Sequence, residues 1–557
     1  MSEFDAIVVG SGITGGWAAK ELTERGLKVL MIERGPDVKH GEYEKEWIEP
    51  WNLPFRGYGD PDLLRRTKKI QSAARLNEWN MDYFVDDELE VYDTPTESNF
   101  QWIRGYQTGG RSLVWGRQTY RMAASYFEAN RQDGHGVDWP IRYEDIAPWY
   151  DYVEEFIGVN GSKENLATAP DGQFQPAMGF NAGEQKLADA IKAQYPDRRL
   201  IPGRGANLTK GIGSRAQCQY RNWCSRGCSF GAYFSTQSST LPAAMATNRL
   251  TLLNDSIVER IDYDQARMRA TGVRVINART GEKSAHTARI IFLCAGSVNS
   301  VSVLLRSTSE KMPQGLGNSS DKLGRYFMDH AYRVGATTTI PGIDNQMYIG
   351  RKPNQVCIPR FVNLGDEKTD FLRGYSYSGY AKRLNWSRGG MASGIGEGLK
   401  QDIRKPGPWQ INLQAAIETL PRESNRITLN TARSDRHGLP LTRIDLRYSE
   451  NERKAAKHAH AELLKMFALL GGEITQSNTE LAPPGTSIHE MGGACMGHDP
   501  RLSVTNAHNQ LHDAPNIFVT DGSAMCSTGD RNPSLTYMAL TVRAAASAVS
   551  MLKNGKL

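Results

Sequence analysis

The stretch FDAIVVGSGITGG, residues 4–16, decides the fold of this chain. It opens with a short apolar run rich in β-branched residues, which is typical of a buried strand. Glycines at positions 10, 12 and 15 follow directly, in the pattern G-x-G-x-x-G. Residues 17–25 carry helix-forming side chains, and residues 28–32 form a second apolar run that ends at Glu33. This order of strand, glycine turn, helix, strand and acidic residue predicts a dinucleotide-binding βαβ unit.

Each part of this unit has a physical role. Gly10 allows the tight turn, Gly12 lets a pyrophosphate approach the backbone, and Gly15 lets the helix lie close to the strand. The helix N-terminus offers free N–H groups and a partial positive charge to the phosphates. Glu33 can bind both ribose hydroxyls and would repel a 2′-phosphate, so FAD or NAD is favoured over NADP. An ordinary glycine turn is the alternative, but the complete set of elements favours the nucleotide.

Length and composition restrict the class of protein. With 557 residues the chain can bury a large core and is expected to form more than one domain. A net charge of +6 is too dilute over this length to indicate nucleic-acid binding. No apolar run approaches the length of a membrane span, so we expect none. The first strand begins within a few residues of Met1, so we expect no signal peptide.

Further patterns extend the α/β prediction. Apolar side chains at helical spacing predict helices over residues 143–157 and 452–470, and a final helix from about residue 532 to 552. An apolar strand, a glycine turn and a helix over residues 288–305 add a second strand-turn-helix unit to the sheet. Residues 331–450 alternate in the manner of antiparallel strands.

Three clustered cysteines, Cys218, Cys224 and Cys228, indicate a metal or redox centre. Zinc normally takes four ligands, yet the nearest histidines in the sequence are His135 and His286. Three soft thiolates in a short loop that contains glycine suit an iron–sulfur cluster better. A zinc site and a purely structural role remain the alternatives.

Several segments together resemble the glucose–methanol–choline (GMC) oxidoreductase family. They occur in the order that the family has, from one end of the chain to the other. The resemblance implies FAD as the cofactor, in a Rossmann-like domain, and a substrate domain built on an antiparallel sheet. The segments are Gly10-x-Gly12-x-x-Gly15, Gly109-Gly110 with Trp115, Cys294-Ala295-Gly296, Gly324 to His330, His489 to Met496, Val519 to Gly522, and Asn532-Pro533-x-Leu535-Thr536.

The resemblance also implies a division of the chain. The FAD-binding domain is expected to be discontinuous, with residues 1–150, 205–330 and 483–557. It is expected to include residues 218–228, here called the cysteine loop. Residues 151–204 and 331–482 are expected to form the substrate-binding domain. The residues implied at the cofactor are Gly10, Gly12, Thr14, Gly15, Glu33, Arg34, Gly109, Gly110, Ser112, Val258, Ala295, Gly296, Asp521, Gly522, Asn532, Pro533 and Ser534.

Two residues are implied in catalysis, His489 and Asn532. A neutral imidazole titrates in the right range to take a proton from an alcohol, while the hydride goes to flavin N5. The amide of Asn532 can donate a hydrogen bond to the substrate oxygen, although Asn before Pro533 is also a common helix start. Some sugar oxidases of the family bind FAD covalently through a histidine, and here the aligned position is Val114, so we expect non-covalent FAD.

The cysteine spacing resembles the motif of bacterial dehydrogenases within the family that carry a [3Fe–4S] cluster. That branch includes the catalytic subunits of FAD-dependent glucose dehydrogenase and glucoside 3-dehydrogenase, and related gluconate dehydrogenases. The resemblance implies a small accessory subunit and a cytochrome-type electron acceptor. Because such a subunit often bears an export signal, we expect either a periplasmic location through this partner or residence in the cytoplasm.

The sequence therefore predicts a dehydrogenase that oxidises a sugar hydroxyl, with C3 of a glucoside or pyranose favoured on the resemblance alone. The alternatives are a glucose C1 dehydrogenase, a gluconate dehydrogenase, or a pyranose oxidase that uses oxygen and needs no cysteine cluster. A non-catalytic flavoprotein that only carries electrons is a further alternative. It is disfavoured because a carrier needs no base such as His489.

Overall fold

The structure is a computed structural model of the 557-residue chain. The residues that it describes are 3–74, 76–348, 350, 352–366, 368–385, 388–389, 392 and 394–557.

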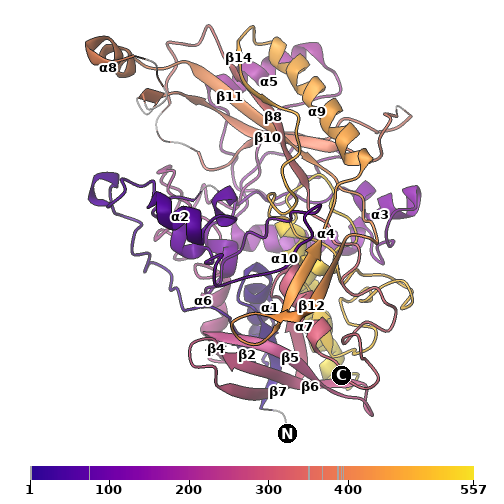
Figure 1. Ribbon diagram of the computed structural model, residues 1–557. Helices are drawn as coiled ribbons and strands as arrows, with labels where there is room; N and C mark the ends of the chain where they lie inside the picture. Colours follow the sequence, from indigo (N-terminus) through magenta and orange to yellow (C-terminus); the bar gives the residue numbers. More distant parts are fainter. Residues whose placement is uncertain are drawn as a thin grey trace.

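The first sheet contains β1 (Phe4–Val9), β2 (Val29–Ile32), β4 (Leu250–Leu253), β5 (Ser256–Asp264), β6 (Arg269–Asn277), β7 (Lys283–Leu293) and β15 (Ile517–Val519). Its order is β4-β2-β1-β7-β6-β5, and β15 pairs with β7. The strands β4, β2, β1, β7 and β15 are parallel neighbours, whereas β5, β6 and the first half of β7 pair antiparallel. This sheet is at the bottom of Figure 1. It confirms the predicted Rossmann-like unit.

Helices cover both faces of the first sheet. Successive side chains of a strand point to opposite faces, so β1 packs against helices on each side. Ala6 and Val8 of β1 pack in one cluster with α1 (Ile13–Glu24) and α10 (Ser534–Lys553). Ile7 and Val9 point the other way, into a cluster with α7 (Ser297–Arg306). Because β1 is covered on both faces, all of its central residues are apolar, as expected for a parallel strand.

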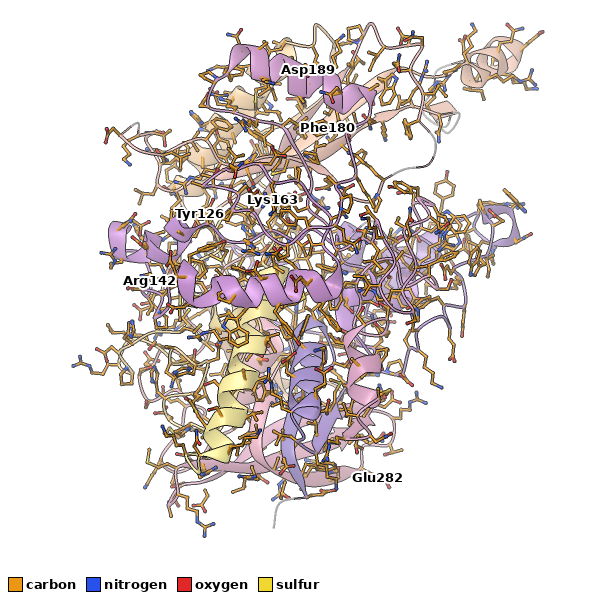
Figure 2. The ribbon with its side chains drawn as sticks, turned by 180° about the vertical axis from the view of Figure 1, so that it is seen from behind. Tyr126, Arg142, Lys163, Phe180, Asp189 and Glu282 are labelled. Atoms are coloured by element: carbon orange, nitrogen blue, oxygen red, sulfur yellow. The ribbon has the colours of Figure 1, made fainter. Side chains whose placement is uncertain are left out.

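The helix α10 is long and apolar enough to cross a membrane, judged by length and composition alone, and it is the one such helix in the described part of the chain. Of its most apolar window, 67% is buried inside the protein. It packs against α1 and against α4 (Tyr143–Ile157), where Tyr150 and Thr536 share a hydrogen bond of 2.9 Å. In Figure 2, which views the molecule from behind, α4 follows Arg142 and crosses the end of α10. These contacts account for its apolar surface as that of a core helix.

The second sheet has the order β14-β8-β11-β10-β9-β3, and all of its pairs are antiparallel. Its strands are β3 (Ile201–Pro202), β8 (Ala331–Thr339), β9 (Val356–Ile358), β10 (Tyr375–Arg383), β11 (Trp409–Ile417) and β14 (Ile474–Asn478). Every second residue of β11 is buried, and this face packs against α5 (Ala182–Gln194) and α9 (Glu450–Ala468). The sheet and these helices form the upper part of Figure 1.

One hairpin differs from the predicted division of the chain. The strands β12 (Arg426–Ser434) and β13 (Pro440–Asp445) form a separate two-stranded sheet. Their residues Ile427 and Ile444 join the cluster of α7 and the first sheet, although the predicted boundaries put them in the substrate domain. The reason is that the chain returns to α7 after β11, before α9 covers the second sheet. The other strands belong to the first sheet over residues 4–293 and 517–519, and to the second sheet at residues 201–202 and over residues 331–478.

The remaining helices and 3-10 turns lie outside the two sheets. They are α2 (Pro61–Thr67), α3 (Ala124–Asp133), α6 (Thr240–Met245), α8 (Gly396–Arg404), and the 3-10 turns η1 (Pro50–Asn52), η2 (Gln71–Ala74), η3 (Met81–Tyr83), η4 (Gly110–Leu113) and η6 (Gly522–Ala524).

Candidate active site

A cavity of about 440 Å³, here called the main cavity, lies at the carboxyl ends of the parallel strands and reaches the second sheet. Open α/β sheets bind ligands at this edge. Most of the residues predicted at the cofactor line it, whereas Gly15, Gly109 and Pro533 do not. Those that line it are Gly10, Gly12, Thr14, Glu33, Arg34, Gly110, Ser112, Val258, Ala295, Gly296, Asp521, Gly522, Asn532 and Ser534.

The glycine turn has the space that a pyrophosphate needs. A Cβ at Gly12 or Gly296 would meet nothing within 4 Å, and both residues line the main cavity. A Cβ at Gly15 would lie 1.9 Å from the carbonyl oxygen of Gly10, so this glycine serves close packing of helix on strand. Because α1 begins at Ile13 with no acidic residue in its first turn, its N-terminal N–H groups and partial positive charge favour a bound anion.

Two buried carboxylates hold the walls of the main cavity in place. Glu33 accepts hydrogen bonds from the backbone and hydroxyl of Ser11, at 3.0 and 2.5 Å, and from the backbone of Gly35 at 3.0 Å. Asp521 accepts from Ser300 Oγ at 2.5 Å and from the backbone N–H of Gly296 at 3.0 Å. Burial raises the pKa of both carboxyl groups. Each carboxylate has lone pairs to spare, so both fit a dinucleotide.

His489 faces the main cavity from a strained turn. Ile488, directly before it, has φ of +63°, which is rare for a β-branched residue. The buried Asp329 holds this turn through the backbone N–H groups of Gly485, at 2.7 Å, and His489, at 2.9 Å, and through the hydroxyl of Ser487. Such strain persists only where the surroundings fix it, and it is concentrated at functional sites.

The ring of His489 lies between two side chains. Its Nε2 is 3.0 Å from Nδ2 of Asn532, and its Nδ1 is 3.0 Å from Nδ1 of His330. Burial lowers the pKa of His489 well below its ordinary value, and the neighbouring His330 and Arg111 lower it further. At neutral pH the imidazole is therefore uncharged, as a proton acceptor must be. The structure thus brings together the two residues predicted in catalysis.

The alternative role for Asn532, as the N-cap of the last helix, does not agree with the structure. The residue at the N-cap of α10 is Pro533, and no side chain makes a capping hydrogen bond. The amide of Asn532 instead reaches across to His489. Its position before the helix therefore serves the cavity, and not the helix end.

An ion pair in the main cavity was not predicted from the sequence. Arg111 of η4 donates to both carboxylate oxygens of Glu490, at 3.1 and 2.7 Å. Glu490 is buried and follows His489 directly, whereas Arg111 follows the glycine pair. The position of Glu490 next to the proposed base was the signal available in the sequence. Its partner Arg111, however, is distant along the chain.

Residues of the second sheet and its loops close the far side of the main cavity. Gln355, Ser378 and Ala416 line it there. Ala416 shares one face of β11 with Asn412 and Gln414, and of these three residues Ala416 lines the cavity. Asn412 donates to the carbonyl of Ala336 and to Thr337 within the sheet.

The cysteine loop lines a second, small cavity, here called the cysteine cavity. Cys218, Cys224 and Cys228 all line it, and burial raises the pKa of Cys218 to about 11. Among the described residues, however, no group of three or more His, Cys, Asp or Glu side chains is arranged to hold a metal ion. The three thiols thus share one cavity, but their arrangement is not that of a closed metal site.

Two arginines in or next to this loop have unpaired nitrogens, although Arg221 also donates to Glu46 at 2.5 Å. Within the described part of the chain, both terminal nitrogens of Arg215 and one of Arg221 are buried without a hydrogen-bond partner. A buried cationic group without an anionic partner is costly, and Arg215 has none among the described residues, so this region favours a bound anionic group. A cluster bound by three thiolates fits this in charge and in donor type.

Two side chains in contact, Arg117 and Tyr233, link the two cavities. Arg117 lines the main cavity, and its guanidinium carbon lies 5.4 Å from the ring centroid of Tyr233. Tyr233 lines the cysteine cavity and donates a hydrogen bond of 2.5 Å to the carbonyl of Leu113. The two cavities are therefore neighbours.

A dinucleotide-type cavity that ends at a histidine and an amide below an antiparallel sheet defines a nucleotide-dependent oxidoreductase. The chain belongs to the GMC oxidoreductase family, since residues 204–332 and 421–541 match its N-terminal and C-terminal family models. Residues 8–39 match a NAD(P)-binding Rossmann-like domain. Membership in this family supports FAD as the dinucleotide of the main cavity.

Relatives match along almost the whole chain. The fructose dehydrogenase large subunit of Gluconobacter japonicus is 26% identical, over 99% of this chain and 98% of its own. The 2-methyl-1,2-propanediol dehydrogenase of Mycolicibacterium austroafricanum is 27% identical, over 97% of this chain and 94% of its own. The solved structure of pyridoxine 4-oxidase from Mesorbium loti shares the fold, with a TM-score of 0.62, 16% identity and 98% of each chain covered.

Proposed function

We propose that this protein is an FAD-dependent dehydrogenase that oxidises a sugar hydroxyl, with C3 of a glucoside as the favoured position and a 3-keto sugar as the product. The observation that carries this proposal is the pair of His489 and Asn532, 3.0 Å apart in the main cavity. An acceptor and a donor at this distance suit the two needs of one alcohol oxygen. The oxygen loses a proton and needs a partner for its developing negative charge.

The residues of this chain divide the work. Nε2 of His489 takes the hydroxyl proton, and Nδ2 of Asn532 turns to donate a hydrogen bond to the substrate oxygen. When bound, FAD supplies the acceptor for the hydride. The glycine turn and Glu33 hold the nucleotide end, and α10 begins at Ser534, which lines the cavity, so its N-terminal charge favours an anion there. Val114 lines the cavity and offers no nucleophile, which supports non-covalent FAD.

The substrate class rests on two kinds of support. One relative is the large subunit of a fructose dehydrogenase and another is a 2-methyl-1,2-propanediol dehydrogenase, and both of these substrates carry C–H bonds next to a hydroxyl. On the side of the second sheet, Gln355 and Ser378 provide polar groups for hydroxyls. We favour the sugar, and within that class a glucoside. Glucose oxidised at C1 and gluconate are the alternative substrates, and an oxygen-using pyranose oxidase is the alternative enzyme.

For electron exit, we propose that Cys218, Cys224 and Cys228 hold an iron–sulfur cluster of the [3Fe–4S] type. The shared cavity and the unpaired nitrogens of Arg215 support it. When bound, such a cluster supplies a one-electron site next to the main cavity.

The surface beside this loop suits a protein acceptor, for which we propose a cytochrome. Trp47 is 55% exposed and lies 6.0 Å, between ring centroids, from Trp223 of the cysteine loop. Trp51 and Tyr58 in the same segment are 65% and 82% exposed. Exposed aromatic side chains of this kind are typical of protein interfaces. A small accessory subunit that carries an export signal is part of this proposal, with the periplasm as one location and the cytoplasm as the other.

The test is turnover of the purified protein with a panel of glucosides, glucose, gluconate and 2-methyl-1,2-propanediol. An artificial electron acceptor is supplied without oxygen in one series, and oxygen alone in the other. We expect turnover with a glucoside and the artificial acceptor, and NMR of the product should show a keto group at C3. Turnover with oxygen alone would replace the dehydrogenase by an oxidase. No turnover of any sugar would contradict the proposal.

A further inference from the structure

A second histidine, His330, stands behind His489 and away from the main cavity. It is fully buried, and its ring lies at 86° to that of His489. Its Nδ1 faces Nδ1 of His489 at 3.0 Å, and its Nε2 faces the backbone carbonyl oxygen of Gly529 at 2.8 Å. Neither the predicted catalytic pair nor the proposed mechanism uses this residue.

The carbonyl of Gly529 decides where the protons of both rings lie. A carbonyl oxygen only accepts hydrogen bonds, so Nε2 of His330 must carry a hydrogen. In a neutral imidazole the other nitrogen is then an acceptor, so Nδ1 of His330 has a free lone pair. Nδ1 of His489 must therefore carry the hydrogen that joins the two rings. The remaining nitrogen of His489, Nε2, is left without a hydrogen.

The other neighbour of His489 agrees with this assignment. Nδ2 of Asn532 can only donate, and it lies 3.0 Å from Nε2 of His489. A hydrogen on Nε2 would place two donors against each other. The lone pair of Nε2 thus faces the position where a substrate hydroxyl would displace the amide.

We propose that His330 is a positioning residue that fixes the tautomer of His489, so that Nε2 is the free base at the main cavity. The direction of the hydrogen bond between the two rings is set by the backbone carbonyl of Gly529, which remains an acceptor whatever side chain is substituted. The adjacent Asp329 holds the backbone of the same turn, so two successive residues set the position and the proton of His489. This inference rests on the proposed role of His489 as the base.

The surroundings keep His330 neutral, as the assignment requires. Burial, with a smaller contribution from Arg531, lowers the pKa of His330 to about 4, although the carbonyl of Gly529 and Asp530 act in the opposite direction. Around His489, the positive charge of Arg111 is paired with Glu490, and Asp329 accepts from the backbone N–H groups of the turn and from the hydroxyl of Ser487. The hydroxyl of Tyr448 donates to the carbonyl of His330 and so does not compete for its ring.

The first measurement is independent of turnover. Neutron diffraction from crystals of the FAD-bound protein, exchanged into heavy water at neutral pH, shows which ring nitrogens carry deuterium. We expect deuterium on Nε2 of His330 and Nδ1 of His489, and none on Nε2 of His489. Deuterium on Nε2 of His489 with a bare Nδ1 would overturn the inference, whatever the substrate of the enzyme is.

The second measurement compares two substitutions of His330. In His330→Asn, the amide oxygen takes the place of Nδ1 and still accepts from His489, whereas His330→Leu removes the acceptor. We expect kcat for His330→Leu to fall about 10- to 100-fold, the factor set by leaving one buried donor unpaired, with KM nearly unchanged. His330→Asn should retain most of kcat. Equal losses in both variants would mean that the ring only fills space, and equal wild-type rates would mean that it fixes nothing.

Controls separate this inference from the proposed function. His458→Asn is the matched control, since His458 also bonds a buried partner, Tyr375, but does not line the main cavity. It should leave kcat unchanged, and all variants must keep a full complement of FAD by visible absorption. If His489→Ala retains turnover, the proposed base is wrong. If His489→Ala is inactive while His330→Leu is as active as His330→Asn, only the inference about His330 fails.

Discussion

At the proposed base in the main cavity the neighbouring charged side chains have partners, whereas beside the cysteine cavity several guanidinium nitrogens have none among the described residues. Arg111 is bound to Glu490, and Asp329 holds the turn of His489. In contrast, Arg215 donates only through Nε, to the carbonyl of Gly231, and its two terminal nitrogens have no partner in the described part of the chain.

The difference teaches how each site depends on its ligand. Side chains that already have hydrogen-bond or ionic partners need no rearrangement when a ligand binds, so the site around His489 is organised before any ligand enters. An unpaired buried cation destabilises the fold until an anion meets it. The main cavity is thus expected to tolerate loss of its cofactor, whereas the cysteine loop should depend on its own.

The largest effect is expected at the organised site. In His489→Ala, the proton acceptor is lost while the segments that bind the nucleotide remain. Removal of a general base typically costs about 10²–10⁴-fold in rate. The measurement is the rate of flavin reduction by substrate in a stopped-flow instrument, with FAD content as the control. A near-normal rate at neutral pH would show that another group takes the proton.

The matching change at the other site is Cys224→Ser. It should abolish iron binding and transfer to a protein acceptor, because an alcohol is a poor ligand for iron that thiolates hold. Flavin reduction by substrate should survive, since Cys224 does not line the main cavity. Iron analysis of protein purified without air and rates with a cytochrome provide the measurement. Iron-free wild-type protein, or a variant that still reduces the cytochrome normally, would remove the cluster from the comparison.

The pH dependence of turnover tests the electrostatics of the organised site. Burial, His330 and Arg111 lower the pKa of His489 below the ordinary value of 6.5. Turnover should therefore persist as pH falls through 6.5, and the acidic limb of kcat/KM should lie below it. The same shift means that folding loses stability as pH falls below 6.5, because the unfolded chain then binds a proton that the folded protein does not. An acidic limb above 6.5 would contradict the lowered pKa.

The unpaired cation gives the sharpest test of the difference between the sites. In protein without iron, Arg215→Met should raise stability by about 1–3 kcal/mol, because a buried donor without a partner is removed. In protein with a cluster, the same change should lower stability and the iron content. Thermal unfolding midpoints and iron analysis measure both. Arg501→Met, which removes an exposed partner of Asp499, is the control and should stay within about 0.5 kcal/mol. A loss of stability without iron would show that Arg215 needs no anion.

The local elements were predictable from the sequence, because each depends on neighbours along the chain. The glycine turn, α1 and β2 follow from patterns a few residues long, and the helix over residues 143–157 has the predicted bounds. In contrast, the division of residues 250–264 into β4 and β5 depends on tertiary pairing, since the chain turns at Asp255, with φ of +48°, from a parallel pair to an antiparallel one.

What could not be predicted depends on contacts between distant segments. Arg111 and Glu490 are 379 positions apart, and no local pattern pairs them. The segment that ends at His330 contributed to the family resemblance, but its role needs the carbonyl of Gly529, 199 positions away. Backbone groups carry no signature in the sequence, so the proton arrangement at His489 appears only in the structure.

The smallest effect is expected for Asn532→Ala, and it separates two roles that the sequence left open. If Asn532 capped α10, its loss would cost about 1 kcal/mol of stability. The structure places Pro533 at the N-cap and the amide of Asn532 at Nε2 of His489. We therefore expect a thermal unfolding midpoint close to that of the wild type and a moderate fall in kcat, smaller than for His489→Ala, because the base remains and only the donor to the substrate oxygen is lost. Asn532→Asp tests the donor itself, since it keeps the size of the side chain and replaces the NH2 group by an acceptor. A loss of stability in Asn532→Ala with unchanged kcat would return this residue to the helix and leave His489 without its partner.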